Sequence, residues 1–158
     1  MLRNLKKNGF TVEELIHVYK TMLRPVVEYG CPVYHSSLTD DQDERLERLQ
    51  DHALKSVYGT ERSARKLRGD AGLVTLRERR ENIVKKFAIK CANDPAFDHW
   101  FPKRQVNRVT RNNDLYLEEK ARCERLKNSP LFYFRRILNG KEGKVYGTRN
   151  KSYREEIH

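Results

Sequence analysis

Three segments of this chain open with the same helix-start signal, and this signal limits the fold more than any other feature. Thr11, Thr39 and Thr75 are each followed three residues later by Glu or Gln, which is the spacing of a capping box. Apolar residues then recur every three or four positions, as they do on one face of an α-helix. No segment shows the clear alternation of a β-strand. The sequence therefore predicts an all-α fold built around a small helical bundle.

Capping residues, glycines and prolines indicate where each helix begins and ends. Pro25 falls within the first long apolar stripe and predicts a kink over residues 21–24, because proline lacks an amide hydrogen and clashes with the preceding turn. Residues 60–72 are interpreted as a loop with one helical turn. Phe97, Trp100 and Phe101 are expected to fold back over the helices. The predicted helices cover residues 2–8, 12–29, 40–58, 76–92, 115–126 and 130–138.

Positive charge is concentrated toward the C-terminus. The 158 residues include 33 Lys and Arg against 22 Asp and Glu, a formal net charge of +11. Residues 1–58 carry 8 basic and 9 acidic side chains, whereas residues 103–158 carry 15 and 7. We therefore expect a helical bundle over residues 1–102 and a basic, partly helical C-terminal extension over residues 103–158. The last 18 residues are rich in charge and poor in apolar side chains, so we expect them to be disordered.

The composition also bears on location. The chain has no apolar run of about 18 residues, which a membrane-spanning helix requires. Its first residues contain no apolar core of signal-peptide length, so we do not expect secretion. Its three cysteines are odd in number and widely spaced, so they do not form a disulfide framework. We therefore expect an intracellular protein of the nucleus or cytoplasm with no membrane partner.

Four segments, in order along the chain, resemble the region that follows the palm domain of non-LTR (LINE-type) retrotransposon reverse transcriptases. They are Tyr19–Tyr34 with its Arg-Pro and Glu-Tyr pairs, Leu46–Gln50 followed by Ala53-Leu54, Leu76–Arg80 followed by Phe87-Ala88, and Arg122–Pro130 with Leu138-Asn139. The resemblance covers most of the chain. It implies the thumb and post-thumb region of such an enzyme, which would hold template–primer duplex or target DNA, with the rest of the reverse transcriptase as a partner in cis or in trans.

Polymerase chemistry is not expected of the isolated chain. The family's polymerases hold two divalent metal ions with an aspartate pair in a hairpin and a further aspartate upstream. Here the one adjacent pair, Asp40-Asp41, follows a predicted N-cap, where carboxylates stabilise the positive end of a helix dipole. The resemblance therefore implies a fragment without the palm, and no templated synthesis from these residues alone.

The sequence also gives little support for a nuclease site or a metal site. Glu118-Glu119-Lys120 has the spacing of a nuclease triplet, but on a predicted helix these are ordinary surface charges. Cys31 and His35 could form half of a zinc site, but no second Cys/His pair lies nearby. We expect Cys91 to be a core residue and Cys123 a half-exposed thiol, and His17, His52 and His99 to be surface or packing residues. No cofactor and no small-molecule substrate are predicted.

Basic residues are the candidate binding groups. Cations lie on two sides of the predicted helix 76–92 and continue beyond residue 103, where they could contact phosphates. Tyr133 and Phe134 beside an Arg pair could stack on unpaired bases. The simpler alternative is that these long cationic side chains only cover apolar helix surface and keep their charged ends in water. The predicted nucleic-acid-binding residues are Arg77, Arg79, Arg80, Lys85, Lys86, Lys90, Arg104, Arg108, Arg111, Arg122, Arg125, Arg135 and Arg136.

Two functions remain open at this stage. The first is a non-catalytic nucleic-acid-binding fragment that contacts an RNA or DNA backbone. The second is a helical protein-interaction module, or a retrotransposon remnant without nucleic-acid function. The two differ in salt dependence, because backbone binding releases counterions and weakens as salt rises.

Overall fold

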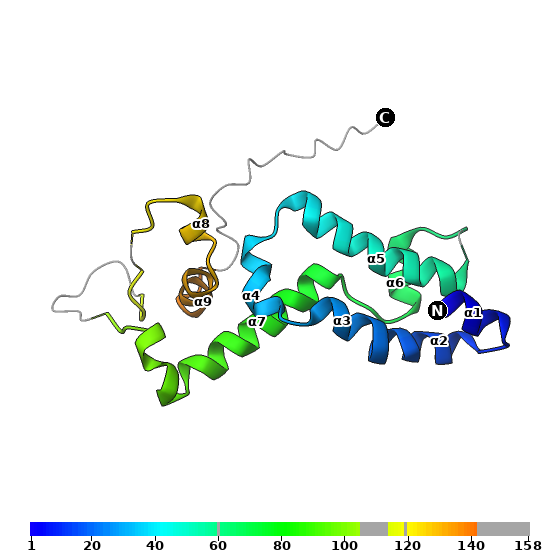
Figure 1. The fold of residues 1–158 in the computed structure, drawn as a ribbon, viewed down its shortest axis with the longest axis horizontal. Coiled ribbons are helices and arrows are strands. Elements are labelled where there is room, and N and C mark those ends of the chain that lie inside the picture. The colour runs from blue at the N-terminus through cyan, green and yellow to red at the C-terminus, as the bar shows by residue number, and fades with distance from the viewer. Residues whose placement is uncertain (60, 105–113, 119, 142–158) are drawn as a thin grey trace.

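The computed structural model describes residues 1–59, 61–104, 114–118 and 120–141 (Figure 1). These residues form helices and turns, and the pairing of extended backbone within them is limited to one antiparallel bridge between Lys103 and Tyr116. The predicted all-α class is confirmed. The disorder predicted for the last 18 residues falls, after Lys141, outside the described residues.

The single helix predicted over residues 12–29 begins at its predicted cap but is divided into two α-helices by a π-helical turn. Helix α1 (Leu2–Lys7) precedes α2 (Val12–Val18), which opens with the predicted capping box of Thr11. A π-helical turn, η1 (Tyr19–Leu23), then leads into α3 (Arg24–Glu28). The second residue of α3 is a proline, which cannot donate a backbone hydrogen bond, and the wider turn lies immediately before it. The irregularity therefore overlaps the predicted kink.

The middle of the chain contains the longest helix. A short helix α4 (Cys31–Tyr34) and a 3₁₀ turn η2 (His35–Ser37) lead to α5 (Asp40–Tyr58). Thr39 forms the predicted capping box with Gln42, and the acidic residues that follow lie in the first turn of α5. The segment predicted as a loop with one helical turn contains a longer helix, α6 (Ala64–Asp70), of seven residues.

The second half of the chain contains α7 (Leu76–Ala92), the 3₁₀ turn η3 (Pro95–Trp100), α8 (Glu124–Lys127) and α9 (Pro130–Leu138). The predicted helix over residues 115–126 is wrong, because among its described residues only those from Glu124 onward are helical.

Long-range hydrogen bonds explain this difference. The side-chain amide of Asn139 accepts a bond from the Tyr116 amide (3.0 Å) and donates one to the Tyr116 carbonyl (3.1 Å). The Arg104 amide also donates to the Leu115 carbonyl at 3.0 Å. Backbone groups that a helix would pair locally are therefore satisfied by distant partners, which keep this segment extended.

The buried apolar residues form two clusters at opposite ends of an elongated molecule (Figure 1). The first cluster joins α1, α2, α5 and α6 through Leu2, Leu15, Ile16, Leu54, Val57, Leu67 and Ala71. The second joins α4, α7 and α9 through Cys31, Val84, Ala88, Cys91, Phe101, Tyr116, Phe134 and Ile137. The second cluster contains residues from both sides of the boundary predicted at residue 102, so α9 is part of a core. Among the described residues, no helix has the length and apolar content needed to cross a bilayer.

Candidate nucleic-acid interface

Helix α7 carries six of the predicted binding residues, and one of them is buried. The Arg80 side chain has no exposed surface and forms an ion pair with Asp43 of α5. Asp43 also pairs with the more exposed Arg77 at 3.5 Å. A guanidinium enclosed by protein cannot reach a phosphate, so the predicted binding role of Arg80 is wrong.

The predicted stacking surface on α9 is also largely buried. Arg135 is 7% exposed and its Nε donates to the Trp100 carbonyl at 2.9 Å, while Phe134 is 3% exposed and packs edge-to-face on Phe87. Tyr133 lies edge-on to the His35 ring, with centroids 5.6 Å apart. The amphipathic α9 places its apolar face in the core, and Arg135 and Phe134 lie on that face. Neither of these two residues is available as a binding residue.

Three other cations of α7 lie on one stripe of the helix. Arg79, Lys86 and Lys90 are separated by seven and four residues, which places them on the same face at 3.6 residues per turn. Lys86 and Lys90 are exposed, and neither forms an ion pair with any residue that the structure describes. Arg79 is held at the start of this stripe by an ion pair of 2.5 Å with Glu28 at the end of α3. We call these three residues the α7 basic row.

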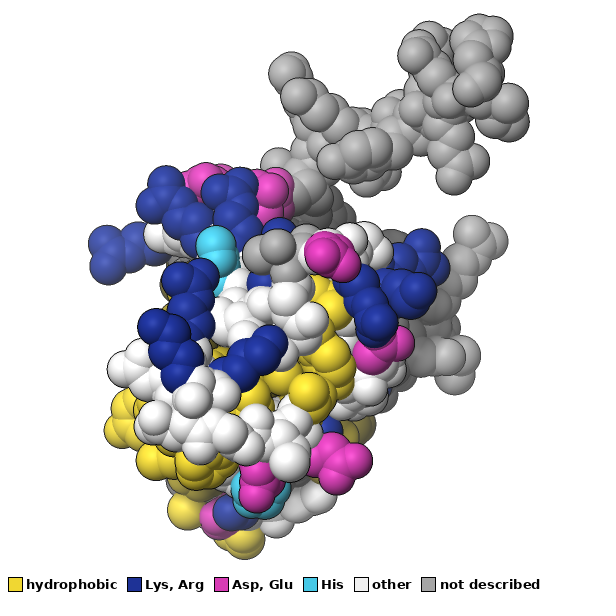
Figure 2. All heavy atoms as spheres, turned by 90° about the vertical axis from the view of Figure 1, so that its right-hand side faces the viewer, with side chains coloured by type: hydrophobic (Ala, Val, Ile, Leu, Met, Phe, Trp, Pro, Cys, Tyr) yellow, Lys and Arg dark blue, Asp and Glu magenta, His cyan; other side chains and the backbone are white. Residues whose placement is uncertain are grey.

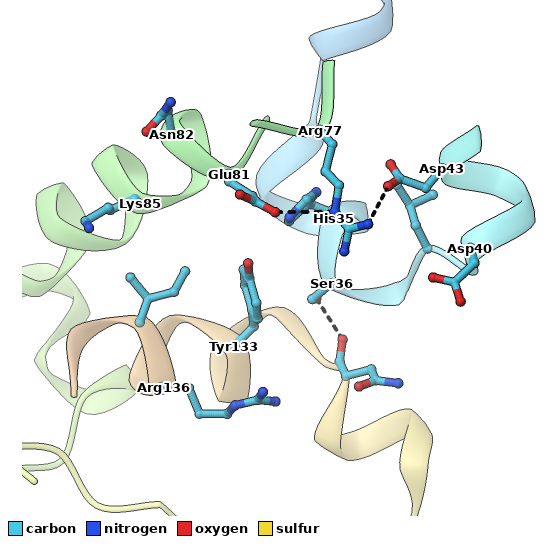
Figure 3. A pocket seen from close by; sticks show the side chains of 13 residues that line it. His35, Ser36, Asp40, Asp43, Arg77, Glu81, Asn82, Lys85, Tyr133 and Arg136 are labelled. Atoms are coloured by element: carbon cyan, nitrogen blue, oxygen red, sulfur yellow. Dashed lines mark hydrogen bonds and ion pairs between the residues drawn. The ribbon is translucent and has the colours of Figure 1, made fainter. Parts of the chain in front are cut away.

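The remaining cations of α7 face a pocket on a different side of the helix (Figure 3). The pocket has a volume of about 330 Å³ and lies between α7, η2 and α9. Its cations are Arg77, Lys85 and Arg136, and its carboxylates are Asp40, Asp43 and Glu81. Arg77 extends between Asp43 and Glu81, at 3.5 and 3.4 Å. The carboxylates balance the positive charge here, so the pocket is less suited to phosphate than the α7 basic row.

His35 lines the same pocket and is held neutral. Burial is the main cause, and the positive charge of Arg80 adds to it, so that the pKa of His35 falls from 6.5 to about 4. The Nδ1 atom is buried and has no hydrogen-bond partner among the described residues. The imidazole therefore acts here as a packing group against Tyr133.

A pH-dependent stability follows from this histidine. In the unfolded chain His35 takes up a proton below about pH 6.5, whereas in the folded chain it does so only near pH 4. We expect the free energy of unfolding to fall as the pH is lowered from 6.5 to 4, and to fall less in His35→Gln. Urea unfolding at pH 7 and pH 4.5 measures both differences, and an equal loss in the two proteins would contradict this assignment.

The C-terminal predicted residues are dispersed. Arg104 is half-buried beside the Lys103–Tyr116 bridge, while Arg122 and Arg125 are exposed around α8. Arg108 and Arg111 lie outside the described residues. The structure therefore does not gather these arginines and the α7 basic row into one described site.

Cys31, Cys91 and Glu118 have structural contacts, whereas Glu119 lies outside the described residues. Cys31 and Cys91 are buried in one apolar cluster, and Cys123 is exposed. Asp114 and Glu118 both accept hydrogen bonds from Lys141. These bonds raise the pKa of that lysine, and the bond to Asp114 has the larger effect. Among the described residues, no group of three or more potential ligands is placed to hold a metal ion.

At the end of the molecule formed by α1, α2, α5 and α6, several cations form ion pairs. Figure 2 shows this end with Lys and Arg side chains in separate groups, interspersed with acidic and hydrophobic ones. Two ion pairs of α6 account for part of this pattern: Arg62 with Asp70 at 3.1 Å and Arg68 with Asp51 at 2.9 Å. The α7 basic row is the better candidate for contact with a polyanion.

Sequence reasoning did not identify one exposed aromatic residue, which is the sequence neighbour of the carboxylate that pairs with Arg79. Tyr29 follows Glu28 directly and is 87% exposed. The available signal was the Gly30 that follows it, which breaks the helix at this point.

No protein-family model matches the chain, and neither a curated protein nor a solved structure matches it.

Proposed function

We propose that this chain is a non-catalytic nucleic-acid-binding module that contacts the phosphate backbone through the α7 basic row. The observation that carries the proposal is the placement of Lys86 and Lys90, which are exposed, aligned with Arg79 and not ion-paired with any described residue. Cations in this state can replace the counterions condensed on a nucleic acid, which is the main source of backbone affinity.

Two further observations support the proposal. The 15 basic and 7 acidic side chains of residues 103–158 add a positive field that attracts a polyanion at long range. The resemblance to the thumb and post-thumb region of LINE-type reverse transcriptases favours the same ligand, because that region would lie against template–primer or target DNA. The proposed contact is with the backbone and reads no particular sequence.

Removing the two lysines should weaken binding and reduce its salt dependence. For Lys86→Gln/Lys90→Gln we expect the slope of log affinity against log salt concentration to decrease by about 2, because about one counterion is released per phosphate contact. Fluorescence anisotropy with a labelled oligonucleotide between 50 and 200 mM salt measures this slope.

The matched control removes the same charge elsewhere. Arg65 and Lys66 are exposed neighbours on α6, in the other half of the molecule. Arg65→Gln/Lys66→Gln should change the slope much less than the α7 variant does. Equal changes in both variants would show that net charge matters and that the α7 basic row is not the site.

A protein-interaction module is the second candidate, and one exposed apolar surface favours it. Met22, Val26, Tyr29 and Val33 are 59%, 74%, 87% and 69% exposed around α3 and α4. Neighbouring apolar side chains exposed to this degree often mark a contact with another protein. Nucleic-acid affinity that is absent, or that does not change with salt, would favour this second function.

A further inference from the structure

Tyr29 lies at a corner of the backbone that exposes its ring. Among the described residues, no other large apolar or aromatic side chain is as exposed. Helix α3 ends at Glu28, and Gly30 then adopts a left-handed conformation with φ of 68° before α4 begins. A residue with a Cβ is strained in this conformation, so the glycine makes the sharp corner possible.

The chain is anchored on both sides of this corner. Cys31 has no exposed surface and belongs to the apolar cluster formed with α7 and α9. The Tyr34 hydroxyl donates a hydrogen bond to the Val27 carbonyl, which ties α4 back to α3. The backbone of Tyr29 is therefore held in place while its ring remains outside, so little conformational entropy is lost when the ring contacts a ligand.

The corner lies at one end of the α7 basic row. Glu28 accepts from Arg79 at 2.5 Å, and Glu28 is the residue directly before Tyr29. From Arg79 the row continues along α7 to Lys90, about 16 Å away at 1.5 Å per residue. The residue that carries the exposed aromatic ring is thus the direct sequence neighbour of the carboxylate that pairs with the first of three aligned cations.

We propose that Tyr29 is a base-stacking platform and that the preferred ligand is single-stranded nucleic acid. This proposal rests on the proposed function, because the α7 basic row supplies the phosphate contacts. Proteins bind single strands by combining a positive track for the backbone with aromatic side chains on which bases stack. Bases inside a duplex already stack on one another and cannot use such a ring. Val26 of α3, three residues before Tyr29 in the sequence, is also 74% exposed.

The test compares the full chain with Tyr29→Ala on three labelled 15-nucleotide probes: oligo-dT, an abasic strand of the same length and a duplex. For oligo-dT we expect Tyr29→Ala to lower the affinity by about 5- to 150-fold, the range for losing one base–aromatic stack. Its affinities for the abasic strand and the duplex should stay close to wild type, and its salt slope on oligo-dT should not change. Tyr29→Trp should retain the affinity for oligo-dT, and Tyr29→Leu, which is apolar without an aromatic face, should lose it.

The other outcomes distinguish failure of the stacking proposal from failure of the proposed function. Unchanged affinity of Tyr29→Ala for oligo-dT, or an equal loss on the abasic strand, overturns the stacking proposal. The proposed function still stands in those cases if Lys86→Gln/Lys90→Gln weakens binding. Wild-type protein that binds none of the three probes overturns the proposed function itself, and Tyr29 would then belong to the apolar protein-contact surface. Circular dichroism of each variant separates loss of a contact from loss of folding.

Discussion

Replacing Asp43 with alanine is expected to destabilise the protein by about 3–5 kcal/mol, because it leaves a buried guanidinium without its counter-charge. Arg80 is fully buried, and its Nε and Nη1 atoms have no hydrogen-bond partner among the described residues. Asp43 is therefore the main compensation for this charge, and removing it costs much more than removing an exposed partner such as Asp41 of the Arg45 pair. Urea unfolding of Asp43→Ala and Asp41→Ala measures the two losses.

The double variant Asp43→Ala/Arg80→Met provides the control. Replacing both members of a buried ion pair with apolar groups is often neutral or stabilising, because neither charge then has to be desolvated. We expect this variant to recover most of the stability lost in Asp43→Ala. A double variant that is less stable than Asp43→Ala would contradict this account, because it would show that the Arg80 side chain stabilises the fold even without its counter-charge.

Truncating Phe134 on α9 should also be severe, at about 3–5 kcal/mol, the usual loss when a buried phenylalanine becomes alanine. Phe134 is 3% exposed and shares a cluster with Val84 and Ala88 of α7. If α9 were only an accessory to an independent bundle, the same change would have little effect on the unfolding of residues 1–102. Thermal or urea unfolding of the full chain measures the change.

Phe132 on the same helix is the matched comparison. It is partly exposed and lies outside the buried cluster, with the Arg135 guanidinium 5.8 Å from its ring centre. Phe132→Ala should therefore destabilise much less than Phe134→Ala. Equal losses would mean that helix propensity on α9, and not burial in the cluster, determines the effect.

The local structure could be predicted because its causes are local. The Thr11 and Thr39 capping boxes and the end of α5 at Gly59 depend on residues only a few positions apart. The predicted helix over residues 115–126 failed for the opposite reason, since Asn139 holds Tyr116 in an extended conformation from 23 residues away. Nothing near residue 116 in the sequence reveals that partner.

In the candidate site, too, local features could be predicted from the sequence, whereas features that depend on tertiary contacts could not. That α7 is a helix rich in cations was readable from the spacing of its residues, and so was the placement of those cations on two sides. Which of them remains at the surface depended on what packs against α7: Arg80 meets Asp43 in the interior, whereas Lys86 and Lys90 face solvent. The exposure of Tyr29 likewise depended on Gly30 turning the chain so that Cys31 enters the core.

The sequence by itself thus determined the all-α class, the helix boundaries set by caps and the uneven charge, because each depends on neighbouring residues or on composition. The tertiary structure alone decided that α9 completes a core with α7, that two predicted binding arginines are buried, and that Tyr29 is exposed next to the residue that pairs with Arg79. These outcomes depend on contacts between residues far apart in the chain, because such contacts determine which side chains are buried.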